Sequence, residues 1–281
     1  MTGPDGLTVV ANTGDDCEVY GVHVSPDPDL LTYWLADVID ERGYGIRGDT
    51  WQVMDALERA GHPTWFRLGD RDLAMCLLRT ELLRSGSRLT EAHAAVVAAL
   101  GVEVRVLPMS DEPVQTHVLA GGRWQPFQEF MILSRAEGPV EGFELRGADS
   151  ARPTPDVLEA IEQAETIVVG PSNPAISIGP ILALPGVREA LRSARAPVVA
   201  VSPFVGGRSV KGPTELFFHH AGHELSAGGV AEAYAGLLDG IVADEPVAGL
   251  PHLEHDTLLD TPEARRGVAE RTLQFAGSLT A

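Results

Sequence analysis

The sequence has 281 residues, which is enough for one large domain or two small ones. Hydrophobic residues make up 44% of it and charged residues 22%, a globular mixture that excludes a wholly disordered chain. The 40 acidic residues outnumber the 21 Lys and Arg residues, and the resulting net charge of −19 argues against duplex nucleic acid and anionic membranes as partners.

The cysteines and the N-terminus bear on where the protein works. Cys17 and Cys76 belong to no CxxC pair, which argues against a disulfide framework or a zinc site. No apolar run approaches the roughly 18 residues that a membrane-spanning helix needs. Residues 1–6 have neither the basic nor the apolar part of a secretory signal. We therefore expect a soluble cytoplasmic protein.

The N-terminal half begins with a predicted strand and continues with helices. Leu7–Ala11 is a short apolar and β-branched run that stops at Asn12, which is typical of a buried strand followed by a turn. The segment Thr50–Leu100 carries apolar residues at helical spacing and is predicted to be mostly helical.

Residues 115–147 favour antiparallel strands instead. Gln115–Ala120 and Arg123–Phe130 flank a Gly121-Gly122 pair, and two adjacent glycines permit the tight turn of a β-hairpin. The sequence therefore predicts a hairpin in the middle of the chain.

The C-terminal half alternates helices and strands. The predicted helices are Pro155–Ala164, Gly186–Ala194 and Glu263–Ala276, and the predicted strands are Thr166–Val169, Pro197–Val201 and Gly240–Ala243. This alternation predicts an α/β fold with a Rossmann-like, doubly wound and mostly parallel sheet. We expect residues 1–60 and 151–281 to form this core, and residues 61–150 to form a helical and β-hairpin insertion.

The loop after the first strand is a candidate metal site. In open α/β sheets, ligands bind outside the carboxyl ends of the strands. Gly14 permits a tight turn there, and the adjacent carboxylates of Asp15 and Asp16 suit Mg²⁺, which prefers hard oxygen ligands. Paired acids that only cap a turn are the alternative.

A second polar loop, Gly170–Pro174, follows the strand Thr166–Val169. Ser172 and Asn173 present donors that suit a base or a phosphate, and the N-terminus of the next helix favours an anion. An ordinary strand-to-helix turn is the alternative.

Two further segments carry charge at the start of predicted helices. Arg71 lies between two aspartates in Gly69–Asp72, where it either forms a structural ion pair or contacts a phosphate while the acids orient it. Ser25–Asp29 is rigid and acidic, and Asp29 either caps its helix or accepts a hydrogen bond from a substrate hydroxyl. The residue pattern alone favours the cap.

Taken together in their order along the chain, these loops are a more specific sign of a protein family than any one of them alone. The segments are VVANTGDD (9–16), VSPDPD (24–29), LGDRDLA (68–74), LPMSDEPVQTHV (107–118), FQEF (127–130), VVGPSNPAISIGPILALPGVREAL (168–191) and VVAVSPFVGG (198–207). In this order they resemble the 2-phospho-L-lactate transferase family of coenzyme F420 biosynthesis, from about residue 7 to the C-terminus.

The resemblance implies a Mg²⁺-dependent transfer between two small molecules. The acceptor is the ribityl hydroxyl of the deazaflavin Fo. The donor is a guanosine diphospho-lactate, the conjugate of 2-phospholactate with GMP, or its enolpyruvate analogue, and GMP leaves. The resemblance also implies a homodimer, a nucleotide-binding core and an insertion that forms the deazaflavin side of the cleft.

The resemblance assigns roles to individual residues. Asp29 and Arg71 match the family's Fo-contacting Asp and Arg and are the predicted catalytic pair. Asp15 and Asp16 match its metal-side loop. The nucleotide side is implied at four positions, Asn12, Ser172, Asn173 and Pro174.

The sequence departs from the family at its N-terminus. A glycine-rich strand and loop precede the NTGDD strand in the family, whereas only MTGPDG precedes it here. We expect a start site assigned too late, with a natural truncation as the alternative. The rival functions are a nucleotide-sugar-binding regulatory protein of the same fold and an inactive, truncated remnant.

Overall fold

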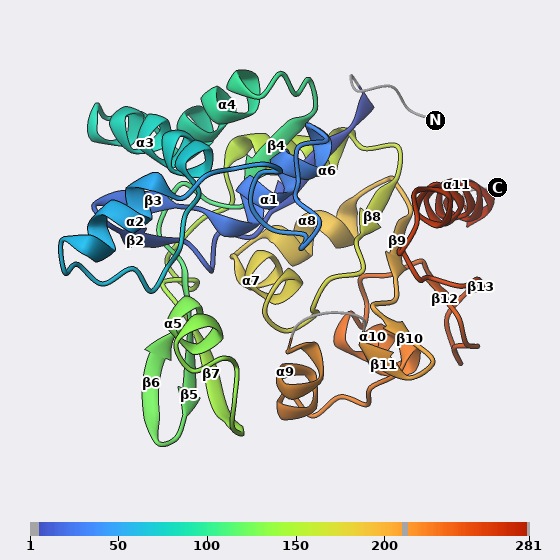
Figure 1. Ribbon diagram of the computed structural model, residues 1–281. Helices are drawn as coiled ribbons and strands as arrows, with labels where there is room; N and C mark the ends of the chain where they lie inside the picture. The colour runs from blue at the N-terminus through green and yellow to red at the C-terminus, as the bar shows by residue number, and fades with distance from the viewer. Residues whose placement is uncertain (1–5, 210–212, 280–281) are drawn as a thin grey trace. The chain divides into compact units, whose positions relative to one another are not determined.

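A computed structural model describes residues 6–209 and 213–279 (Figure 1). The expectation about the start of the chain concerns residues 1–5 and what precedes them, and so lies outside the described residues. Two compact units are present. The N-terminal unit comprises residues 2–138 and 144–157, and the C-terminal unit comprises residues 139–143 and 158–281. The division into a core and an insertion at residues 61–150 stays a prediction.

The N-terminal unit contains the first predicted strand. This strand, β1 (Thr8–Ala11), pairs in parallel with β4 (Arg105–Pro108). Helices α1 (Pro26–Leu35) and α4 (Leu89–Ala99) pack against the pair. The apolar contacts that hold this layer come from Val9, Ala11, Leu31, Val97, Val102 and Val106.

A second layer of the unit joins a short hairpin to two helices. The hairpin consists of β2 (Cys17–Val19) and β3 (Val22–Val24), and the helices are α2 (Gln52–Arg59) and α3 (Asp70–Arg84). These helices and α4 confirm the mostly helical prediction for the segment from residue 50 to 100. Their common core consists of Val19, Val22, Val24, Met54, Leu68, Leu73 and Cys76.

The LGDRD segment joins α2 to α3 through reciprocal caps. The carboxylate of Asp49 accepts the backbone N–H groups of Arg71 at 2.9 Å and Asp72 at 3.1 Å at the start of α3. The carboxylate of Asp70 in turn accepts the N–H groups of Gln52 and Val53, both at 3.0 Å, at the start of α2. Each acid thus satisfies donors that a helix N-terminus leaves unpaired.

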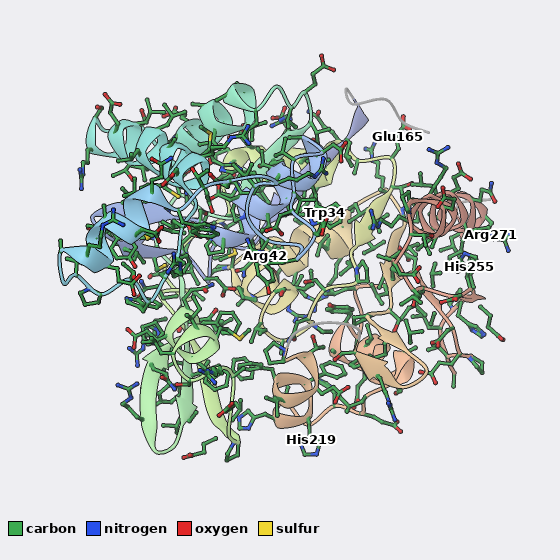
Figure 2. The ribbon with its side chains drawn as sticks, viewed as in Figure 1. Trp34, Arg42, Glu165, His219, His255 and Arg271 are labelled. Carbon is green, nitrogen blue, oxygen red and sulfur yellow. The ribbon has the colours of Figure 1, made fainter. Side chains whose placement is uncertain are left out.

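The loop between α1 and α2 is held by local contacts. Ile39 and Ile46 form an isolated antiparallel bridge. The guanidinium of Arg42, labelled in Figure 2, lies 5.6 Å from the ring centroid of Tyr44 and 5.7 Å from that of Trp51. These cation–π contacts hold the Arg42 side chain against one ring within the loop and one ring at the start of α2.

The predicted hairpin is present but shorter than expected. Strands β5 (Gln115–Ala120) and β6 (Arg123–Pro126) pair antiparallel, and Gly121 and Gly122 have φ of 58° and 69°, as a two-residue turn requires. The extension of the second strand to Phe130 is wrong, because Phe127–Ile132 forms helix α5. Pro126 has no N–H with which to continue the ladder, and it begins the helix instead. Strand β7 (Val140–Arg146) lies beside β5.

The C-terminal unit is built on a parallel sheet. Its strands, in spatial order, are β13 (His252–Glu254), β12 (Gly240–Ala243), β9 (Val198–Val201) and β8 (Ile167–Val169). All three pairings are parallel. Strands β9 and β12 are wholly buried, which is why their sequences are continuous apolar runs. The α/β class and the parallel sheet are therefore confirmed.

Helices accompany this sheet. Helix α11 (Pro262–Leu279) packs Val268 and Ala276 against β9 and β12. The remaining elements are α6 (Pro155–Gln163), α7 (Ile178–Ala183), α8 (Val187–Ser193), β10 (Phe204–Val205), β11 (Arg208–Ser209), α9 (Thr214–His220) and α10 (Ala227–Ala233). The predicted helices at 155–164, 186–194 and 263–276 are thus all present, with small shifts at their ends. Within the described residues, every helix is too short or too polar to cross a membrane.

We predict that Gly69→Ala destabilises the fold by about 2 kcal/mol, because a Cβ at this position would lie 2.1 Å from Oδ2 of Asp49 and would displace the cap of α3. Gly69 has a φ of −66°, which suits any residue, so the cost arises from the lost cap. Urea unfolding followed by circular dichroism measures the change. Gly267→Ala in α11 is the control, because no atom lies within 4 Å of its added Cβ. Equal stability of Gly69→Ala and the parent would contradict the reciprocal caps.

Candidate functional site

The acidic loop lies directly after β1, as predicted. Its first residue, Asn12, is buried and holds the loop through two side-chain hydrogen bonds. Oδ1 of Asn12 accepts the N–H of Gly14 at 2.7 Å, which closes the turn. Nδ2 of Asn12 donates to Oδ2 of Asp27 at 2.9 Å. The loop therefore approaches the first turn of α1, and sequence reasoning missed Asp27 although it lies in the SPDPD segment.

Asp16 is held by two side chains. Its Oδ2 lies 3.0 Å from Nε2 of His23, and its Oδ1 accepts the hydroxyl of Ser25 at 2.7 Å. Burial raises the pKa of Asp16, while the contacts with His23 and Ser25 act in the opposite direction. Both oxygens are thus oriented by the strand β3 and the residue that follows it.

Asp15 has an unsatisfied carboxylate oxygen. Only 8% of Asp15 is exposed, and its Oδ1 has no hydrogen-bond partner among the described residues. Burial, followed by the negative charges of Asp27 and Asp16, raises the pKa of Asp15 well above its ordinary value, while the neighbouring side chains of Thr116 and Asn12 act in the opposite direction. Burial also raises the pKa of Asp27 to about 6. The charges of Asp27 and Asp16 thus raise the pKa of Asp15, and the charge of Asp16 raises that of Asp27, so a positive charge beside Asp15 would be stabilising.

These carboxylates are donors of the kind that a divalent cation prefers, although among the described residues only Asp29, Asp72 and Cys76 bring three ligand atoms within 4.8 Å of one another. Asp15, Asp16 and Asp27 offer hard oxygen donors, and the free oxygen of Asp15 is buried where water access is restricted. The donor set suits Mg²⁺ or Mn²⁺ and contains no thiolate, because burial and the neighbouring acids raise the pKa of Cys17 to about 12. Whether a cation binds here stays a prediction.

A cavity of about 190 Å³ opens beside the acidic loop. The loop contributes residues 14–19, and strand β5 contributes Gln115 and Thr116. Trp65 and Phe127 add aromatic surface, and Gln128 and Glu129 add polar groups. The hydroxyl of Thr116 is buried without a hydrogen-bond partner among the described residues. The NTGDD and FQEF segments, far apart in the sequence, therefore line one cavity.

Asp29 and Arg71 do not line that cavity. Helix α1 begins at Pro26, so Asp29 lies inside its first turn and the predicted role as helix cap is wrong. Both oxygens of Asp29 bind the guanidinium of Arg79, at 2.6 and 2.8 Å. Arg71 is exposed, and its Nη1 donates to the backbone carbonyl of Arg47 at 3.3 Å. Within the described residues Arg71 forms no ion pair with its flanking aspartates.

The second polar loop belongs to the C-terminal unit. Oδ1 of Asn173 accepts the N–H groups of Ala175 at 2.9 Å and Ile176 at 3.3 Å. Nδ2 of Asn173 is buried and unpartnered among the described residues, whereas Ser172 is exposed and Pro174 is buried. The side chain of Asn173 thus holds the loop in its conformation, and Nδ2 of Asn173 remains available to donate a hydrogen bond to a ligand.

Residues 2–259 match the family model described as 2-phospho-L-lactate transferase CofD. The chain belongs to this family. Membership confirms the resemblance that the ordered loops suggested, and it makes the chain a transferase, as predicted.

Relatives with two different names are similar to this family member. The chain is 39% identical over 278 residues to the 2-phospho-L-lactate transferase of Methanosarcina mazei, covering 95% of this chain and 91% of the relative. It is 40% identical over 285 residues to the phosphoenolpyruvate transferase of Thermobifida fusca, covering 97% and 88%. Protein BH3568 from Bacillus halodurans is similar in structure, with a TM-score of 0.59, 17% identity, and 95% of this chain and 91% of that chain covered. That similarity bears on the fold alone.

We predict that the transferase binds Mn²⁺ and that Asp15→Asn weakens this binding at least tenfold, because the variant lacks the free carboxylate oxygen. Without a divalent cation at pH 8, Asp15→Asn should melt at a higher temperature than the parent, because a carboxylate whose pKa is raised destabilises the fold once it is ionised. Added Mn²⁺ should reverse the order. Isothermal calorimetry and thermal melts measure both effects.

Asp149→Asn, at an exposed position of the same unit, is the matched control and should change neither quantity. Unchanged Mn²⁺ affinity in Asp15→Asn would rule out this carboxylate as a ligand.

Proposed function

We propose that this protein transfers a 2-phospholactyl or enolpyruvyl-phosphate group from a guanosine diphospho donor to the ribityl hydroxyl of Fo and releases GMP. The observation that carries the proposal is the match of residues 2–259 to the 2-phospho-L-lactate transferase family. The reaction belongs to coenzyme F420 biosynthesis, and its products are GMP and the coenzyme without its glutamate tail, or the dehydro form of it.

Two donors remain under the proposal. The relatives named for 2-phospho-L-lactate and for phosphoenolpyruvate are 39% and 40% identical to this chain, so identity favours neither. The two donors differ by two hydrogens at one carbon pair. A direct comparison of both donors with the purified protein decides between them.

The cavity beside the acidic loop supports an aromatic acceptor. Trp65 and Phe127 offer the flat apolar surface that a deazaflavin ring needs, and Gln128 and Glu129 offer polar groups for its edge. A volume of about 190 Å³ holds one part of Fo and not the whole molecule. We assign the ring to this cavity and the ribityl chain to the side of Asp15.

The nucleotide of the donor is assigned to the loop of the C-terminal unit. The free amide donor of Asn173 suits a carbonyl oxygen of guanine or a phosphate oxygen, and the exposed hydroxyl of Ser172 suits a phosphate. Asn12 is already engaged by Asp27 and Gly14, so its contribution is to shape the loop that faces the diphosphate.

Asp15 and Asp16 of the acidic loop would hold the divalent cation. When bound, such a cation neutralises the charge of a diphosphate. This matters in a chain with a net charge of −19, although charges beyond a Debye length of about 8 Å are largely screened. Arg71 would supply an exposed positive charge, and a charge pair at about 4 Å gains roughly 4 kcal/mol at an effective dielectric constant near 20.

The transfer itself needs positioning more than proton chemistry. The ribityl oxygen forms a bond to the phosphorus nearer the organic acid, the bond from that phosphorus to the GMP oxygen breaks, and the hydroxyl proton leaves to solvent or a nearby carboxylate. Asp29 is poorly placed to take this proton in the described conformation, because both of its oxygens bind Arg79. Its predicted contact with Fo is testable by Asp29→Asn.

We predict that Arg71→Ala lowers kcat/KM for Fo at least tenfold and leaves the melting temperature within about 1 °C of the parent. The side chain is exposed and its one hydrogen bond is long, so its loss costs little stability. Release of GMP under steady-state conditions measures the rate. Arg105→Ala is the control, because Arg105 lies at the start of β4, at the opposite end of the strand pair from the acidic loop. Transfer by Arg71→Ala at the parent's rate would remove Arg71 from the site.

We predict that Trp65→Ala weakens Fo binding by 10- to 100-fold, because an aromatic face is lost from the cavity. Fo fluorescence titration measures the affinity. Trp124→Ala is the matched control, since Trp124 is 42% exposed on β6 and does not line the cavity. Saturable Fo binding by the parent without transfer from either donor would instead favour the inactive remnant, and an absence of saturable Fo binding would favour the regulatory protein.

A further inference from the structure

Thr116 of strand β5 has a buried hydroxyl without a partner. Only 1% of the residue is exposed, and its Oγ1 forms no hydrogen bond with any of the described residues. A hydroxyl both donates and accepts hydrogen bonds, and leaving it unpaired in a protein interior costs free energy. The stability of the fold therefore gives no reason for a hydroxyl at this position.

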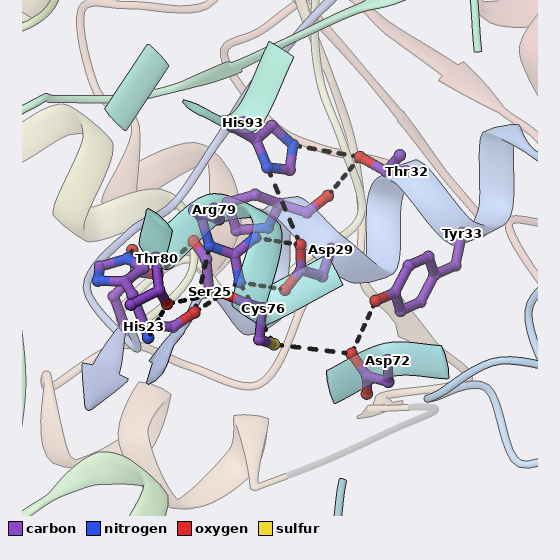
Figure 3. Close-up of polar contacts among 12 residues, drawn as sticks. His23, Ser25, Asp29, Thr32, Tyr33, Asp72, Cys76, Arg79, Thr80 and His93 are labelled. Atoms are coloured by element: carbon purple, nitrogen blue, oxygen red, sulfur yellow. Dashed lines mark hydrogen bonds and ion pairs between the residues drawn. The ribbon is translucent and has the colours of Figure 1, made fainter. Parts of the chain in front are cut away.

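Two other buried threonines of the N-terminal unit show the contrast. Oγ1 of Thr32, labelled in Figure 3, donates to the backbone carbonyl of Pro28 at 2.8 Å. Oγ1 of Thr90 donates to Oδ1 of Asp111 at 2.7 Å, at the start of helix α4. In both positions the hydroxyl stabilises the fold through its bond. Thr116 lacks such a bond.

The unpaired hydroxyl belongs to the wall of the cavity. Thr116 lines the cavity of about 190 Å³ together with Asp15, whereas Thr13, whose buried hydroxyl is also unpaired, does not line it. Thr116 lowers the pKa of Asp15, so the two side chains are neighbours. Neither Oγ1 of Thr116 nor Oδ1 of Asp15 has a hydrogen-bond partner in the described part of the chain. The wall thus combines an unpaired hydroxyl with an unpaired carboxylate oxygen.

The backbone fixes the position of this hydroxyl. The N–H of Thr116 donates to the carbonyl of Gly14 at 2.7 Å, which joins β5 to the acidic loop. Helix α5 packs against β5. Threonine is β-branched, so its χ1 angle is restricted and the direction of the hydroxyl follows from the backbone. A ligand that binds this hydroxyl therefore orders little that is not already ordered.

The chemistry of the wall favours an alcohol as the ligand group. A phosphate or a carboxylate would be repelled by Asp15, whereas an alcohol is neutral. An alcohol can also accept a hydrogen bond from Thr116 while it donates one to a carboxylate oxygen. A ring carbonyl can only accept, so it would leave the carboxylate oxygen unpaired.

We propose that Thr116 is a specificity-determining residue, whose hydroxyl binds a hydroxyl group of the polyol chain of the acceptor. The proposal rests on the proposed function, which assigns the ribityl chain to the side of Asp15. The bond forms in the bound ground state and persists in the transition state, so it lowers KM for the acceptor and leaves kcat unchanged.

The test compares two variants in Fo fluorescence titrations, steady-state kinetics and thermal melts. Thr116→Val keeps the shape of the side chain without the hydroxyl, and Thr116→Ser keeps the hydroxyl. Thr116→Val should melt at or above the parent temperature, because it removes an unpaired buried group, and should bind Fo about fivefold or more weakly. Its KM for Fo should rise by the same factor, with kcat within about twofold of the parent. Thr116→Ser should bind Fo within about twofold of the parent.

Thr90→Val is the matched control, because its hydroxyl is bonded to Asp111 and does not line the cavity. It should melt below the parent temperature and bind Fo with the parent's affinity, the reverse of Thr116→Val. A deazaflavin with a pentyl chain in place of the ribityl chain gives a second readout. It should bind the parent and Thr116→Val with nearly equal affinity, because it has no chain hydroxyl to lose.

Three outcomes overturn the role of Thr116 and leave the proposed function standing. The first is Fo binding by Thr116→Val within about twofold of the parent. The second is an equal loss of affinity for Fo and for the pentyl analogue, which would indicate a disturbed cavity. The third is a melting temperature of Thr116→Val clearly below that of the parent, which would make the hydroxyl structural. If the parent itself neither binds Fo nor transfers to it, the proposed function fails and the role of Thr116 fails with it.

Discussion

Carboxylates buried next to one another need a positive charge, and this requirement shapes the N-terminal unit. Asp29 has its cation within the chain, because the guanidinium of Arg79 binds both of its oxygens. Asp15 has none that the described residues supply, and its free oxygen lies beside Asp16 and Asp27, whose charges raise its pKa. Asp29 and Asp15 therefore differ in role although both lie in the same acidic region. Asp29, which Arg79 already neutralises, connects α1 to α3, and Asp15, which is not neutralised in this way, is the carboxylate that we propose for the site.

The strands and the loops that follow them could be predicted from the sequence, and the physical reasons are specific. The apolar runs at β9 and β12 are continuous because both strands are wholly buried, whereas β1 and the edge strand β8 carry similar runs although they are only partly buried. The turn at Gly121 and Gly122 could be predicted because glycine adopts the positive φ angles of a two-residue hairpin turn without strain. The helix at Phe127 was missed because its aromatic residues also suit a strand, and the decisive signal was Pro126.

The site was predicted only in part. The acidic loop could be found because a strand end and adjacent carboxylates mark it. Arg79 could not be found, since a buried arginine in a helix has the same sequence appearance as an exposed one, and only the fold brings it to Asp29. The LGDRD segment shows the converse case. Its glycine leaves room for the Asp49 carboxylate that caps α3, and its first aspartate caps α2. Arg71 is exposed and donates to the backbone carbonyl of Arg47.

The physical chemistry of the cavity agrees with a transfer between two small molecules. Under the proposed function, a planar acceptor would gain binding energy from Trp65 and Phe127, whereas the reacting end would need a polar region in which charge is neutralised. The acidic loop supplies that region only if a cation accompanies the donor, because bare carboxylates would repel a diphosphate. Binding of the donor and of the cation should therefore favour each other, as linkage requires when two opposite charges share one site. A chain with a net charge of −19 can select an anionic donor under this condition, since the attraction comes from the bound cation and not from the surface.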